Sequence, residues 1–111
     1  MGIKDDILER LPLFTKICAD YSVKYLYVFG SSLTNYPDPE NSDIDLLVEI
    51  DDDDPVGRGE KLLGLWDTLE DFFKRKVDLL TWPSIRNPVL RENIDKTKTL
   101  IYDGEGEKVF I

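Results

Sequence analysis

The sequence predicts a small α+β (or α/β) domain, in which helices flank a mixed β-sheet. Segments with helical apolar spacing alternate with short runs of branched and aromatic residues that read as strands. The length of 111 residues fits one domain of ordinary size. Hydrophobic residues make up 41% and charged residues 33% of the chain, which is enough for one modest core. We therefore expect residues 1–111 to form a single domain.

The first half of the chain reads as helix, strand, loop and strand. Apolar residues recur at helical spacing over residues 3–19, where Pro12 either begins a second short helix or kinks a longer one. Residues 25–29 predict a strand that ends at Gly30. The polar residues 31–42 indicate a loop with room for one helical turn, and residues 44–50 alternate as a second strand. An antiparallel pair of strands is favoured, because no crossover helix long enough for a parallel return lies between them.

The second half continues as turn, helix, strand, helix and strand. The acidic residues 51–54 and Pro55 predict a solvated turn, and the spacing of apolar residues from Gly59 onward predicts an amphipathic helix. Residues 77–81 read as a third strand. Asn87 and Pro88 are suited to cap and begin a helix that reaches about residue 96. Residues 100–102 predict a last short strand, and residues 103–106 a turn.

The composition excludes several classes of function. The net charge of −9 disfavours general nucleic-acid binding, because an acidic surface repels phosphate backbones. The chain has no histidine, which removes Ser-His-Asp and Cys-His catalysis and imidazole-ligated zinc. The single cysteine, Cys18, lies in an apolar stretch and is expected to be buried rather than nucleophilic. No segment has the roughly 20 apolar residues of a membrane span or the apolar run of a signal peptide, so we expect a soluble cytoplasmic protein that does not bind a membrane.

Two acidic residues open the second predicted strand. Residues two apart on a strand face the same side, so Asp43 and Asp45 are expected to direct their carboxylates at one spot. A divalent cation between them would reverse their mutual repulsion. Gly30 and Ser31, at the end of the preceding strand, could offer backbone N–H groups and a hydroxyl to a phosphate, although glycine–serine after a strand is by itself usually only a turn.

A third carboxylate, Asp78, lies inside an apolar strand. A charged group is costly to bury there unless something compensates it. Taken alone, Asp78 is equally compatible with a strand edge, an ion pair with Arg75 or Lys76, or a functional role. Together with Asp43 and Asp45 it completes a set of three carboxylates suited to hard cations such as Mg²⁺ or Mn²⁺.

The ordered combination of these features resembles a known family. Val28-Phe29-Gly30-Ser31, eleven further residues and then Asp43-Ile44-Asp45 is similar to the signature of the minimal nucleotidyltransferases (MNT), small relatives of the polymerase-beta-like superfamily. Residues 76–81 resemble the strand that carries the family's third carboxylate, and residues 87–94 resemble its closing helix. Ser32 stands where members often have an arginine. The resemblance spans residues 24–102 and implies the nucleotidyltransferase fold.

The resemblance also implies a function and a set of roles. ATP is the implied substrate, with two Mg²⁺ ions bound by Asp43, Asp45 and Asp78, and Asp78 is also the expected proton acceptor. Gly30, Ser31 and Ser32 are the expected nucleotide-binding residues. The implied activity is transfer of AMP to a hydroxyl group of a HEPN-domain toxin, expected to be that of a tyrosine. This chain would be the antitoxin of the pair, and it is expected to be able to form oligomers. The alternative is an inactive MNT module that neutralises its partner by binding alone.

Overall fold

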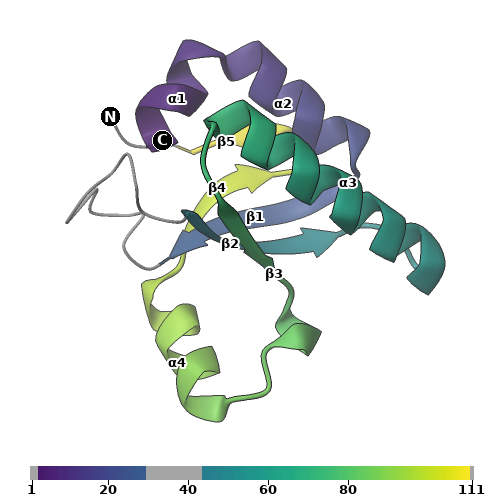
Figure 1. The fold of residues 1–111 in the computed structure, drawn as a ribbon, viewed down its shortest axis with the longest axis vertical. Helices are drawn as coiled ribbons and strands as arrows, with labels where there is room; N and C mark the ends of the chain where they lie inside the picture. Colours follow the sequence, from purple (N-terminus) through teal and green to yellow (C-terminus); the bar gives the residue numbers. More distant parts are fainter. Residues whose placement is uncertain (1–2, 30–43, 111) are drawn as a thin grey trace.

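The computed structural model describes residues 3–29 and 44–110, which form one mixed sheet and the helices that cover it (Figure 1). The helices are α1 (Ile3–Glu9), α2 (Leu11–Asp20), α3 (Pro55–Phe73), the 3-10 helix η2 (Trp82–Ser84) and α4 (Pro88–Thr97). The strands are β1 (Val23–Phe29), β2 (Ile44–Ile50), β3 (Val77–Leu80), β4 (Thr99–Asp103) and β5 (Lys108–Val109). The α+β class predicted from the sequence is confirmed.

The sheet has the strand order β3-β2-β1-β4-β5. β1 pairs antiparallel with both β2 and β4, which confirms the pairing predicted for the first two strands. β2 and β3 are parallel, and α3 supplies the crossover that a parallel pair requires. β3 is therefore one edge of the sheet.

The main core lies between one face of the sheet and α1, α2 and α3, which Figure 1 shows together on that side. Phe14 of α2 is fully buried, with its ring centroid 5.7 Å from that of Phe72 and 6.5 Å from that of Phe73. β2 contributes every second residue, Ile44, Leu46, Val48 and Ile50. Cys18 belongs to this core, and burial raises the pKa of its thiol to about 12, which confirms a packing role over a nucleophilic one.

The opposite face of the sheet carries a smaller apolar cluster, which we call the α4 cluster. Its buried members are Phe29, Leu47, Ile85 and Ile94, and Tyr27, Leu80 and Trp82 pack against them. α4 and η2 cover this face, on the side of the sheet away from the other helices (Figure 1). The sheet is thus buried on both faces over part of its area.

Several elements differ from the sequence prediction, among them η2, which was not predicted. α3 begins at Pro55 rather than near residue 59, because the Asp54 carboxylate accepts hydrogen bonds from the N–H groups of Val56 and Gly57 at 3.3 Å each and caps the helix. β1 begins two residues earlier than predicted, and the two-residue strand β5 was not predicted. Within the described residues, no helix has the length and apolar content needed to cross a membrane.

Gly104 is a position at which a side chain should be strongly destabilising. Its N–H donates to the Lys24 carbonyl at 2.8 Å, and a Cβ added at Gly104 would lie 2.1 Å from the Val23 carbonyl oxygen. Because the clash is with backbone, Gly104→Ala is expected to lower the free energy of unfolding by about 1–3 kcal/mol or more. In α3, a Cβ at Gly59 meets nothing within 4 Å, so Gly59→Ala should instead stabilise by about 0.5–1 kcal/mol. Urea denaturation of both variants checks this, and equal midpoints would contradict it.

Candidate functional site

Asp45 lies on β2 and faces the side of the sheet covered by α4. Its neighbours Ile44 and Leu46 are fully buried against the helical layer. Because successive side chains of a strand point to opposite faces, Asp45 shares the other face with Leu47, a member of the α4 cluster. Asp45 itself is half-buried. Its carboxylate therefore lies at the border between apolar cluster and solvent.

Asp78 is the register partner of Asp45 on the parallel strand β3. Neighbouring strands lie about 4.8 Å apart, and paired positions present their side chains on the same face. Asp78 is half-buried as well, on the face that it shares with Leu80. On the other side of β2, Asp45 pairs with Phe29, the last residue of β1. The two strands thus bring Asp45 and Asp78 together. They lie at the end of the sheet where β1 ends and β2 begins.

Side chains of α3 fix the start of β3 and hence the position of Asp78. The indole Nε1 of Trp66 donates to the Val77 carbonyl at 2.6 Å, and the Glu70 carboxylate accepts from the Val77 N–H at 2.9 Å. On the β2 side, the Ile44 N–H donates to the Lys76 carbonyl at 3.0 Å. Because β3 is an edge strand, the bonds from Trp66 and Glu70 satisfy backbone groups of Val77 that would otherwise have no partner in the sheet. The residue before Asp78 is therefore held from both sides.

Aromatic and cationic side chains gather on the same face, around η2 and α4. The guanidinium carbon of Arg91 lies 5.0 Å from the Trp82 ring centroid, and the Lys98 ammonium lies 5.2 Å from the centroids of both Trp82 and Tyr27. Arg91 also donates to the carbonyls of Trp82 at 2.8 Å and Ile85 at 3.0 Å. We did not predict this group from the sequence, because Tyr27 is far from the other members in the chain and the contacts depend on how α4 packs.

The remaining predicted site residues, Gly30, Ser31, Ser32 and Asp43, lie outside the described residues. Their assigned roles stay predictions. Among the described residues, 3–29 and 44–110, no three acidic or cysteine side chains form a group that could hold a metal ion. The pair Asp45 and Asp78 nevertheless offers only carboxylate oxygens, which are the ligands that a hard cation such as Mg²⁺ prefers.

The acidic residues 51–54 do not lie beside Asp45, and two of them stabilise local structure. Asp54 caps α3, and the Asp52 carboxylate forms an ion pair with the Lys61 ammonium at 2.6 Å. The hydrogen bond from Lys61 lowers the pKa of Asp52. This run follows the last residue of β2, at the far end of the strand from Asp45.

The amino-acid sequence of this chain is similar to those of known proteins. A family model described as "Polymerase beta, Nucleotidyltransferase" matches residues 14–107. The curated relative "Putative protein adenylyltransferase MJ1379" of Methanocaldococcus jannaschii is 39% identical over 103 residues, which are 92% of this chain and 99% of the relative.

Solved structures share the fold at lower identity. A crystal structure of a toxin–antitoxin with AMP-PNP matches with a TM-score of 0.58 and 24% identity, and the match covers 85% of this chain and 77% of that one. A tri-AMPylated Shewanella oneidensis HEPN toxin in complex with MNT antitoxin matches with a TM-score of 0.51 and 22% identity, covering 92% of this chain and 76% of the other. These likenesses establish the architecture.

Proposed function

Because this chain belongs to the polymerase beta nucleotidyltransferase family, we propose that it transfers AMP from ATP to a hydroxyl group of a partner protein. Membership of the family gives the reaction class, nucleotidyl transfer. A protein as acceptor is supported by the name of the curated relative, a protein adenylyltransferase. ATP as donor is supported by the AMP-PNP in a toxin–antitoxin structure of the same fold.

The pairing of Asp45 with Asp78 across β2 and β3 is the observation that carries the proposal. Two half-buried carboxylates at adjacent strand positions repel each other, and the sheet keeps them together because backbone bonds fix the register. A divalent cation held between them would offset this repulsion. In this proposal Asp43, Asp45 and Asp78 would hold two Mg²⁺ ions, or Mn²⁺, which when bound neutralise the triphosphate and the charge that develops on it.

The protein's own groups then have distinct tasks. Gly30, Ser31 and Ser32 are proposed to hold the triphosphate through backbone N–H groups and hydroxyls. Asp78 is proposed to take the proton from the acceptor hydroxyl. The acceptor oxygen forms a bond to the α-phosphorus while the bond between that phosphorus and the bridging oxygen to the β-phosphate breaks, and pyrophosphate leaves.

The partner in this proposal is a HEPN-domain toxin, and the acceptor is a tyrosine. Support comes from the structure of the same fold in which an AMPylated HEPN toxin is bound to an MNT antitoxin. The net charge of −9 is consistent with a basic partner surface. We further propose that residues 1–111 act as one minimal nucleotidyltransferase domain in the cytoplasm, where ATP is present.

The proposal predicts transfer of label from α-labelled ATP and none from γ-labelled ATP. The purified chain is incubated with Mg²⁺, each labelled ATP and its HEPN-domain partner, and the label on the partner is measured and mapped by mass spectrometry. EDTA should abolish the transfer, because carboxylates alone cannot neutralise the triphosphate. A stable complex without any transfer of α-label would contradict the proposal, and would indicate neutralisation by binding alone.

A further inference from the structure

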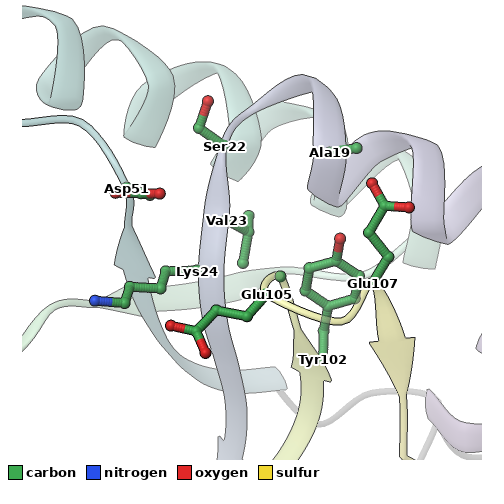
Figure 2. Close-up of a pocket in the computed structure, with 9 residues that line it drawn as sticks. Ala19, Ser22, Val23, Lys24, Asp51, Tyr102, Glu105 and Glu107 are labelled. Atoms are coloured by element: carbon green, nitrogen blue, oxygen red, sulfur yellow. The ribbon is translucent and has the colours of Figure 1, made fainter.

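Figure 2 shows a pocket that lies at the end of β2 away from Asp45. It has a volume of about 240 Å³, which suits the head group of a small ligand rather than a whole nucleotide. Its walls come from the end of α2, the turn into β1, the end of β2 and the turn between β4 and β5. The side chains used below are Ser22, Lys24, Asp51, Tyr102, Glu105 and Glu107.

This pocket is separate from the candidate active site. Asp51 directly follows β2 and Asp45 is near the start of that strand, so the two residues are six positions apart, roughly 20 Å along an extended chain. The pocket also opens beside α2, on the helical face, whereas Asp45 faces α4. A ligand in the pocket would therefore not contact the carboxylates proposed for AMP transfer.

The floor of the pocket is the hydroxyl group of Tyr102. Tyr102 is 1% exposed and belongs to the main core, and Figure 2 shows its hydroxyl directed into the pocket. Within the described residues, none of the hydrogen bonds involves this hydroxyl. Burial raises the pKa of Tyr102, so the phenol stays protonated at neutral pH. This hydroxyl lines the pocket and has no protein partner among the described residues, so a ligand that enters the pocket can bond to it.

The charge around the pocket favours a cation. Three lining residues are acidic, Asp51, Glu105 and Glu107, and one is basic, Lys24. The Lys24 ammonium lies 5.9 Å from the centroid of the Tyr25 ring, and no ion pair found among the described residues joins it to the three carboxylates. The negative end of the α2 dipole adds to the same field, because α2 ends at Asp20 beside the pocket.

The walls of the pocket are preformed by backbone hydrogen bonds. The Asp51 N–H donates to the Ser22 carbonyl at 2.8 Å, and the Gly104 N–H donates to the Lys24 carbonyl at 2.8 Å. Ser22 and Glu107 hold left-handed backbone, with φ values of 55° and 49°. Two turns are thus pinned to the sheet on either side of the Tyr102 hydroxyl, so little order has to be gained when a ligand binds.

We propose that this pocket binds the guanidinium head group of a small organic cation or of a partner's arginine. A guanidinium presents five N–H donors in a planar fork, which suits acceptors that surround a pocket, whereas an ammonium presents three. The Tyr102 hydroxyl and the carboxylate of Glu107 are the principal acceptors, and Asp51 and Glu105 supply the remaining negative charge. The proposal assigns a role to the hydroxyl that the fold itself leaves unused.

The test is a titration of the ¹⁵N-labelled chain with methylguanidinium chloride, followed by amide chemical shifts. Saturable shifts in the millimolar range, confined to Ser22, Lys24 and residues 103–107, are expected. Tetramethylammonium chloride at the same concentration carries the charge without N–H donors and should produce no such shifts. A blocked arginine tripeptide is titrated in parallel, and tighter binding of the tripeptide would identify a protein chain as the source of the guanidinium.

Tyr102→Phe provides the decisive variant. It removes only an oxygen that has no protein partner, so the thermal midpoint should stay unchanged or rise, while methylguanidinium binding should weaken by about tenfold or more. Glu107→Gln should weaken binding similarly, whereas Glu92→Gln on α4 should leave it unchanged. Absence of saturable shifts in the natural chain, or equal affinity of the Tyr102→Phe variant, would overturn the proposal.

Discussion

Asp78→Asn is expected to reduce AMP transfer by about a thousandfold or more, with the fold retained. Asparagine has nearly the shape of aspartate, so the register between β2 and β3 and the bonds that fix Val77 should survive. The amide carries no negative charge to attract a divalent cation and cannot accept the proton of the attacking hydroxyl. Asp45→Asn should reduce transfer to a similar degree, because it removes the other half of the register pair.

The matched control for these variants is Glu49→Gln. Glu49 lies on the same strand and the same face as Asp45 but is exposed and four residues further along, where it pairs with Tyr25. Its loss of charge should leave the transfer rate within about twofold, because at that distance an exposed charge is largely screened. Transfer of α-labelled AMP to the partner is measured for each variant, with circular dichroism as the test of folding. Full activity of a folded Asp78→Asn chain would exclude Asp78 from the reaction.

The direction in which Asp45 faces could be predicted from the sequence, because side chains alternate along a strand. The pattern of residues 44–50 predicts that Asp45 and Leu47 share a face, and the structure agrees, because a buried strand leaves only two orientations for its side chains. The neighbour of Asp45 on β3 could not be obtained in this way. Register between parallel strands depends on where α3 begins and ends, and the sequence pattern placed the start of α3 four residues too late. The sequence groups Asp78 with Asp45 as carboxylates of one predicted site, but only the structure shows that they are register partners.

Features assembled from distant segments were beyond the reach of sequence patterns. Tyr102 reads from the sequence only as part of a short strand, and nothing in residues 100–106 indicates that the turn from β4 encloses a pocket with α2 and the end of β2. The aromatic and cationic group around Trp82 has the same origin. Such sites arise from packing between elements, whereas periodicity reports on one element at a time.

α4 is anchored to the sheet by few buried side chains. Ile94, at 1% exposed, is its only buried residue, and it packs in the α4 cluster with Phe29, Leu47 and Ile85. The neighbouring apolar residues Val89 and Leu90 are 65% and 43% exposed. The side chain of Arg91 adds two hydrogen bonds to carbonyls in and after η2. The attachment of α4 therefore depends chiefly on one side chain.

Ile94→Ala is accordingly expected to free α4 and η2 from the sheet while the main core stays folded. The substitution removes most of a buried side chain, which costs about 2–5 kcal/mol, and this loss falls on a unit that shares few other contacts with the core. Amide hydrogen exchange should accelerate by about a hundredfold or more over residues 91–98 and remain slow in β1 and β2, since each 1.4 kcal/mol corresponds to a factor of ten. Leu90→Ala, on the exposed face of the same helix, should change exchange by less than tenfold, roughly 1 kcal/mol.

The same variant links the packing of α4 to the reaction. Asp45 pairs with Phe29 on β1, and Leu47 lies two residues after Asp45 on β2. Both Phe29 and Leu47 belong to the α4 cluster, so the Asp45 carboxylate borders that cluster on two sides. When Ile94→Ala uncovers that cluster, the half-buried carboxylates become more exposed to water, which weakens the electrostatic interactions that hold a bound nucleotide. AMP transfer should therefore fall in Ile94→Ala and stay unchanged in Leu90→Ala. Acceleration of exchange across β1 and β2 as well would show that α4 unfolds only with the whole domain, and loss of activity would then report on global stability instead.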